Sequence, residues 1–324
     1  MVSPRATSAL ASLRPDIKDA LTEFDLFLNR QKMVGLTVMP VIEVEMQAGS
    51  FPVIKKSSLL ANAETARASG GSYNQIGFEF EDATFATKEN GLAMPIDERK
   101  RAMFSQFGLE MMYAEIVRDV VERNQEKRIA DMIFNTSTFT PTAVTNEWDD
   151  ADNATPIDDV EARVQVMMDR GVFANALIIN EKVFRNLRNC QQIIDRIASS
   201  GAGDATKARD ITTNMLAQCF DLDKIIVAGA MTKTSADGAA TFTGGPIWSG
   251  EYAAVCRVAD PGDPITNPCV GRVFHWGGDG SSIDGTFETW YENMVRGDMV
   301  RYRKVTQERL MHSDCVELLS NITT

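Results

Sequence analysis

The side chains that most often carry catalytic or metal chemistry are scarce in this sequence. It contains two histidines, His275 and His312, and five widely spaced cysteines without a Cys-x-x-Cys pair. Because histidine is the commonest general base and metal ligand, most hydrolase and metalloenzyme mechanisms lack their usual residues here. His275, beside Trp276 at a predicted strand end, is better explained as structural. His312 lies close to Cys315, but spacing alone does not identify a Cys–His nucleophile pair.

Two short runs resemble ligand-binding motifs without matching them. The acidic run at 149–153 lacks the central Gly and the final Glu of a calcium loop, so it predicts a turn and a helix cap. The run at 201–207 lacks a Gly before its Lys and follows no predicted strand, which argues against a phosphate-binding loop. Neither Gly-x-Ser-x-Gly nor His-Glu-x-x-His occurs. We therefore predict no catalytic residue, no cofactor and no metal site.

The composition is that of a folded, acidic protein. The 324 residues include 33 Lys and Arg against 45 Asp and Glu, a net charge of −12, and 44% are hydrophobic. Tight nucleic-acid binding needs a basic surface that displaces counterions, and an anionic membrane also attracts basic proteins, so neither partner is favoured. No apolar run approaches the roughly 18 residues that span a membrane, and residues 1–15 lack a secretory signal. The odd number of cysteines indicates free thiols in a reducing cytoplasm.

The first third of the sequence predicts an arm, two strands and an unusually long loop. Apolar residues recur at helical spacing before residue 30, which indicates an amphipathic arm. Alternating apolar and polar residues predict strands over 42–46 and 76–81. The intervening segment, 47–74, is far longer than a usual hairpin loop of about two to five residues. It is either a mobile surface loop or an arm that folds onto another subunit.

The strongest local pattern predicts a helix from Asp97 to Phe134. Asp97 can cap its first turn, no Pro interrupts it, and Gly108 is its only Gly. Apolar residues from Met103 to Ile133 follow one face, and charged residues follow the other. Such a helix would be about 55 Å long, which is typical of a spine laid along an extended molecule. The alternative is two helices with a break near Asn124.

The rest of the chain predicts an α+β fold with one domain inserted into another. From Pro156 helices are expected over 157–170, 181–198 and 211–220, and strands over 175–179, 224–228 and 253–258. The Gly-rich segment 229–247 predicts an exposed hairpin or loop. Strands follow over 270–275, 286–291 and 298–306, and a last apolar segment covers 313–322. One domain would contain both ends of the chain, and the second would lie in the middle.

This ordered set of segments resembles the major capsid proteins of tailed phages with the Hong Kong 97-type fold. Residues 78–85 and 90–99 are similar to the strand that enters the spine helix of that family. Residues 174–194 are similar to the strand and helix of its axial domain, and residues 294–322 to its closing peripheral strand and C-terminal core segment. The resemblance covers roughly residues 30–322 and depends on the order of the segments.

The resemblance implies the parts of a capsid subunit. An N-arm would cover 1–35, a peripheral (P) domain 36–150 and 263–324, and an axial (A) domain 151–262. The P domain would include an extended E-loop over 47–74 and the spine helix over 97–134. Expected inter-subunit contacts are Lys55, Lys56, Leu59, Leu60, Arg67 and Tyr73 in the E-loop, and Leu13, Ile17, Leu21 and Phe24 in the N-arm, with Lys233 and Asp237 in an axial loop at the capsomer axis.

The implied function is structural rather than enzymatic. Hexamers and pentamers would assemble in the bacterial host cytoplasm into the icosahedral capsid of a virion around packaged double-stranded DNA. Because the chain starts at Met1 without room for a cleaved scaffolding region, a separate scaffolding protein is expected, together with a portal protein and a decoration or cement protein. Acidity agrees with weak, non-specific contact with the packaged DNA. Some relatives cross-link an E-loop lysine to a neighbour's Asn, and Lys55 and Lys56 lie in that loop without an identifiable Asn.

Two other hypotheses about the function remain open. An encapsulin-like compartment would use the same fold around an enzyme cargo, and a cargo-peptide pocket on its inner face would distinguish it. A cytoplasmic α+β enzyme would need a concave site with a polarised nucleophile or base. The scarcity of histidine argues against the enzyme.

Overall fold

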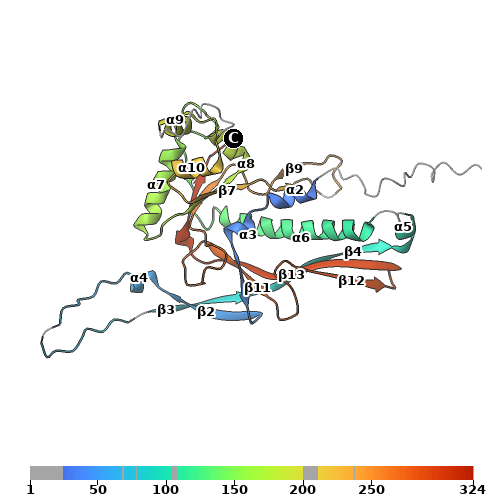
Figure 1. Ribbon diagram of the computed structural model, residues 1–324, viewed down its shortest axis with the longest axis horizontal. Coiled ribbons are helices and arrows are strands. Elements are labelled where there is room, and N and C mark those ends of the chain that lie inside the picture. Colours follow the sequence, from blue (N-terminus) through green and yellow to red (C-terminus); the bar gives the residue numbers. More distant parts are fainter. Residues whose placement is uncertain are drawn as a thin grey trace, which may run out of the picture.

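The molecule is elongated, with two lobes and a long projecting arm (Figure 1). The computed structural model describes residues 25–67, 69–77, 79–103, 108–199, 211–236 and 238–323. The expected N-arm contacts at Leu13, Ile17, Leu21 and Phe24 lie outside the described residues, as does Asp237 of the expected axial loop.

The helices and strands follow the α+β order expected from the sequence. The helices are α2 (Leu26–Gln31), α3 (Gly35–Val38), α4 (Lys56–Leu59), α5 (Glu98–Met103), α6 (Leu109–Ile133), α7 (Pro156–Asp169), α8 (Glu181–Leu187), α9 (Gln191–Ser199) and α10 (Thr213–Cys219), with a 3-10 turn at Ser313–Cys315. The strands are β1 (Val41–Val44), β2 (Ala48–Ile54), β3 (Phe80–Ala86), β4 (Lys88–Asp97), β5 (Thr142–Ala143), β6 (Ala176–Asn180), β7 (Lys224–Ala228), β8 (Met231–Lys233), β9 (Gly244–Pro246), β10 (Ala253–Cys256), β11 (Gly271–Trp276), β12 (Thr286–Glu292), β13 (Gly297–Leu310) and β14 (Val316–Ser320).

The first lobe is a long sheet covered on one face by α6. Strand β13 pairs with β4 along one edge and with β12 and then β11 along the other, and β1 adds to β11. Side chains alternate across a strand, so Val300, Tyr302 and Lys304 are buried while Arg301 and Arg303 point to the other face. Tyr302 packs against Val117 and Val121 of α6. The helix therefore runs along the sheet as a spine (Figure 1).

The second lobe is a five-stranded sheet in the order β5-β14-β10-β6-β7, with α7 to α10 around it (Figure 1). Every residue of β6 and β10 is buried, which explains why these strands are continuous apolar runs. The core of this lobe continues into the first one through Ile129 and Ile133 of α6. Strand β14 lies between β10 and β5, although the sequence had placed 263–324 with the other sheet.

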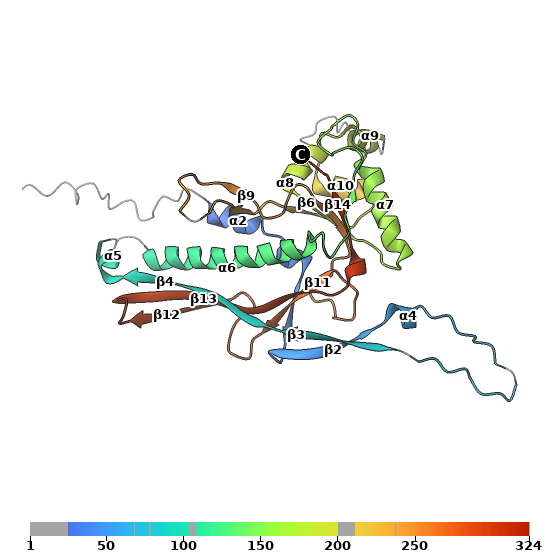
Figure 2. The same ribbon diagram turned by 180° about the vertical axis from the view of Figure 1, so that it is seen from behind.

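The arm consists of β2 and β3 and a long excursion beyond them. The two strands pair from Ala48 opposite Ala86 to Ile54 opposite Phe80. We call residues 55–79 the extended loop. Figures 1 and 2 show it reaching away from both lobes, with α4 close to its base. A long segment between two paired strands was predicted and is present, but its bounds were wrong. Residues 48–54 of the predicted loop form β2, and the second strand begins at Phe80 rather than at Ile76. The strand predicted over 42–46 corresponds to β1, which pairs with β11 instead.

Two helix predictions were wrong in their boundaries. The long helix begins at Leu109 and not at Asp97, and it continues through Asn124 without the alternative break. Residues from Glu98 form the separate α5, where the Glu98 backbone N–H donates to the Arg296 carbonyl at the sheet end. The helix predicted over 181–198 is divided into α8 and α9. The Gln191 N–H donates to the Ala151 carbonyl, outside the helix, so the backbone ladder is interrupted there.

Candidate functional site

The residues that could carry nucleophilic chemistry are placed unfavourably for it. Burial raises the pKa of Cys315 to about 12, whereas a reactive cysteine needs a lowered pKa. Burial also lowers the pKa of His312. His275 is buried with its Nδ1 3.1 Å from the Val305 carbonyl, which supports the structural interpretation. The described residues include no group of three or more His, Cys, Asp or Glu that could hold a metal, and no described helix is long and apolar enough to cross a membrane.

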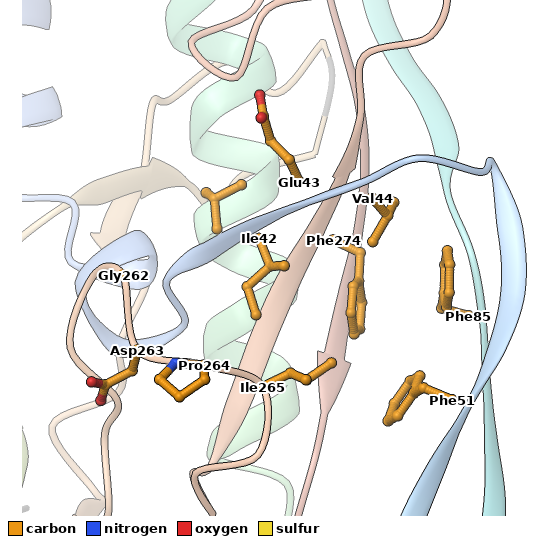
Figure 3. Close-up of a pocket in the computed structure, with 11 residues that line it drawn as sticks. Ile42, Glu43, Val44, Phe51, Phe85, Gly262, Asp263, Pro264, Ile265 and Phe274 are labelled. Atoms are coloured by element: carbon orange, nitrogen blue, oxygen red, sulfur yellow. The ribbon is translucent and has the colours of Figure 1, made fainter.

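The cavity beside β1 is an apolar packing site (Figure 3). Phe85 stacks on Phe274 with ring centroids 5.1 Å apart, and Phe51 tilts against Phe274 at 5.7 Å. Its ionisable lining residues are Glu43 and Asp263, and Figure 3 shows both carboxylates pointing away from the three rings. No acid–base pair converges there. The rings instead attach the root of the arm to β11.

The extended loop carries the predicted contact residues, and most of them are exposed. Leu59 and Leu60 lie side by side in sequence at the base, and the Arg67 guanidinium lies 4.5 Å from the centroid of the Tyr73 ring. Lys55 pairs with Glu79 inside the loop, at 3.3 Å. The sequence prediction that these side chains face another subunit stays a prediction, because the structure contains one chain.

The expected axial loop does not lie at the far end of the second lobe, where an axial position was expected. Lys233 is in β8, and the β8–β9 hairpin passes over α2, where the Met231 N–H donates to Asn29 Oδ1 at 2.8 Å. Figure 1 shows α9, not this hairpin, at the end of the lobe farthest from the long sheet. A place for Lys233 at a capsomer axis stays a prediction, and its location beside α2 does not favour it.

The sequence did not reveal the buried carboxylate that joins the two lobes. Glu126 of α6 accepts hydrogen bonds from the Val34 N–H at 2.8 Å, the Gly35 N–H at 2.7 Å and Trp248 Nε1 at 2.6 Å. Burial raises its pKa, and the three donors oppose that effect. Sequence periodicity placed Glu126 on the charged face of the helix. No local signal indicated that Trp248, far along the chain, would cover it.

An ion pair between α6 and β13 gives the fold an acid-sensitive contact. Arg128 donates from Nε and Nη2 to the two Glu308 carboxylate oxygens, each at 3.0 Å. Burial alone would raise the pKa of Glu308, but the bonds from Arg128 and Gln125 hold it below the ordinary value of 4.5. A carboxyl whose pKa is lowered by folding stabilises the fold above its unfolded pKa, and this stabilisation is lost as the pH falls through the folded pKa.

We therefore expect the stabilisation that ionised Glu308 gives to the fold to be lost in acid. Near neutral pH the native chain should be more stable than Glu308→Gln by about 1 kcal/mol, the size of a charge-assisted contact with a partly exposed partner. The difference should shrink as the pH falls below about 4.5, the ordinary pKa of the group. Urea unfolding of the unassembled chain at several pH values measures this. A difference that grows towards low pH would contradict the assignment.

Comparison with known proteins relates this chain to phage capsid proteins. No family model matches the sequence. The chain is 24% identical over 223 residues to the major capsid protein of Burkholderia phage BcepMu, an alignment that covers 66% of this chain and 69% of the relative.

Solved structures resemble the chain over nearly its whole length. A phage-related protein from Bordetella bronchiseptica RB50 has a TM-score of 0.65 at 17% identity, covering 94% of this chain and 98% of that one. The capsid of a native GTA particle has a TM-score of 0.55 at 12% identity, covering 98% and 99%. The capsid of cyanophage P-SCSP1u has a TM-score of 0.57 at 10% identity, covering 87% and 86%. The expected resemblance to tailed-phage major capsid proteins is thus confirmed: the chain has the fold of phage capsid proteins and a phage major capsid protein as a sequence relative.

Proposed function

We propose that this chain is the major capsid protein of a tailed phage, with a fold of the Hong Kong 97 type. Copies of it associate as hexamers and pentamers, and these close into an icosahedral shell that encloses double-stranded DNA. The role is structural, and the chain performs it by binding other copies of itself.

The observation that carries this proposal is an arm whose apolar residues the chain does not cover. A compact solitary protein would fold residues 55–79 onto its own body, because exposed apolar surface is costly. Here a whole series of large side chains in the arm is open to solvent. Their exposed fractions are 60% for Leu59, 66% for Leu60, 73% for Tyr73, 52% for Ile76 and 63% for Phe80. A neighbouring copy is the surface that would bury them in a shell.

The parts of the molecule correspond to the domains of that capsid type. The long sheet and α6 form the peripheral domain and its spine, and the second lobe forms the axial domain around the capsomer axis. The extended loop is the E-loop, with Leu59, Leu60, Arg67 and Tyr73 against the adjacent subunit. Assembly takes place in the host cytoplasm with a separate scaffolding protein, and a portal protein and a decoration or cement protein join the shell.

The charge of the chain suits a container for DNA. Its net charge is −12, and a negative wall repels phosphate instead of binding it. Packaged DNA would therefore touch the shell weakly and without sequence preference.

Electron microscopy of the chain co-expressed with its scaffolding protein tests the proposal. Closed shells built of hexamers and pentamers are the expected result. Shells that selectively enclose a host enzyme would instead identify a nanocompartment of the encapsulin kind, which the similarity to phage major capsid proteins does not favour. A chain that stays monomeric at high concentration with its scaffold present would refute the shell function.

A further inference from the structure

Lys56, at the base of the extended loop, is bound to the second lobe of its own chain. Its Nζ donates to Asp314 Oδ2 at 2.6 Å and to the Arg170 carbonyl at 2.6 Å. The contacts connect residues that are 258 and 114 positions apart in the sequence. Figures 1 and 2 both show α4 next to the end of α7 that lies nearest the arm. The base of the loop therefore spans the gap between the arm and the second lobe.

The two acceptors, the Arg170 carbonyl and the Asp314 carboxylate, lie next to each other in the second lobe, where an ion pair connects α7 to β14. Arg170 caps the C-terminus of α7, where backbone carbonyls without helical partners attract a cation. Its guanidinium pairs with the buried Glu317 of β14 at 2.5 Å. Asp314 lies three residues before Glu317, in the 3-10 turn that leads into β14. Lys56 thus binds a site that α7 and β14 hold in place together.

The neighbouring lysine provides an internal comparison. Lys55 and Lys56 have the same side-chain exposure, 43%. Lys55 pairs with Glu79, on the returning side of the loop, so this contact lies within the loop. Lys56 alone of the pair connects the loop to a different lobe. The two lysines have the same type and exposure, and they differ in their partners: Lys55 pairs within the loop, and Lys56 binds the second lobe.

The other polar contacts of the loop base stay within the loop, where the Glu79 N–H donates to Ser58 Oγ at 3.2 Å and the Lys55 N–H to the Glu79 carbonyl at 3.2 Å. Helix α4 has one turn, too short to be stable alone. Beyond it the apolar side chains are exposed, so they contribute little that would fix the direction of the loop. At the other end of the arm, Phe51 and Phe85 hold the strands on β11. Two attachments, one on each lobe, determine how the arm leaves the body.

We infer that Lys56 is a positioning residue: by binding Asp314 and the Arg170 carbonyl of its own chain, it sets the direction in which the extended loop leaves the subunit. The prediction that Lys56 contacts a neighbouring subunit stays a prediction; the inference gives this side chain a role within its own chain, and the exposed residues beyond α4 are then free to contact the neighbour. The inference deepens the proposed function, because a loop presented in one direction reaches its neighbour with less ordering cost.

Hydrogen exchange on the unassembled full-length chain tests the anchor directly. In Lys56→Ala, the amides of residues 58–60 should exchange about fivefold faster, since these amides report local opening of α4. The matched variant Lys55→Ala should leave those amides within about twofold of the native rate. The α6 amides serve as a standard for intact folding in both variants. Unchanged exchange in Lys56→Ala, or equal effects of the two lysines, would overturn the inference.

A double-mutant cycle separates the anchor from a general effect of charge. If Lys56 acts through Asp314, the double variant Lys56→Ala with Asp314→Ala should exchange no faster than the more affected single variant. Additive effects would show that the two residues act independently and would refute the anchor.

The yield of closed shells with scaffold is then measured for the same variants. A loosened loop with poor closure supports the positioning role, whereas a loosened loop with normal closure removes it. Failure of the native chain to form shells would instead refute the proposed function.

Discussion

Deleting residues 57–72 is expected to leave a folded subunit that no longer forms closed shells. The deletion removes part of α4 and most of the extended loop, and none of the described residues in it belongs to the buried core of either lobe. Loop shortening changes chain entropy only slightly, so the stability of the two lobes should be nearly unchanged. Leu59 and Leu60 are lost with the loop, and with them the apolar surface proposed to bind the adjacent copy.

Two measurements on the same protein decide this prediction. Thermal unfolding of the deletion variant should give a midpoint within a few degrees of the native one, which shows that the lobes remain folded. Electron microscopy with the scaffolding protein should show no closed particles, where the native chain forms many. Replacing Leu59 and Leu60 by Ser, without any deletion, should reduce closure in the same direction. Normal particles from the deletion variant would contradict the assignment of the loop as an inter-subunit arm.

Glu126→Ala should destabilise the subunit by about 3 to 5 kcal/mol. The substitution leaves the Val34 and Gly35 N–H groups and Trp248 Nε1 buried without their acceptor. Each buried donor without a partner costs about 1 to 3 kcal/mol. Because Trp248 packs in the core shared by both lobes, the loss should affect the lobes together rather than one end of α6.

Urea unfolding of the unassembled chain measures this effect. Glu126→Gln retains one carbonyl oxygen, which can accept two of the three bonds, so it should lose only part of that stability. Glu110→Ala is the matched control, since Glu110 is exposed on the same helix, and it should change stability by no more than about 0.5 kcal/mol. If Glu126→Ala were as stable as Glu110→Ala, the buried carboxylate would not hold the lobes together.

Segments with strong periodic patterns were predictable from the sequence. The apolar runs of β6 and β7 and the alternation in β12 gave strands within one residue of those observed. Helix α7 was also predicted well, because Pro156 stands at its first turn, where Pro is favoured. In each of these cases the signal that fixes the element is local.

Features that depend on residues far apart in the sequence were not predictable. The place of α5 at the sheet end was one of them: its first residue, Glu98, bonds to the turn between β12 and β13, almost two hundred positions later. Lys56 appeared to be a free loop lysine, since nothing near it in the sequence indicated Asp314 or the end of α7. Glu126 appeared to be a surface residue of an amphipathic helix, because only the folded chain brings Trp248 over it. The spacing of apolar and charged residues shows which residues share a face of a helix, but it does not show which distant residues pack on that face.

The position of β14 has a consequence for how the protein is made. This strand separates β5 from β10 in the second sheet, and the ribosome reaches it only after residue 315. Until then β10 has an open edge, and the Leu318 and Leu319 side chains are missing from the interior. Pairing across such long sequence distances is slow to form. The second lobe therefore cannot complete its sheet and core until residues 316–320 have been synthesised.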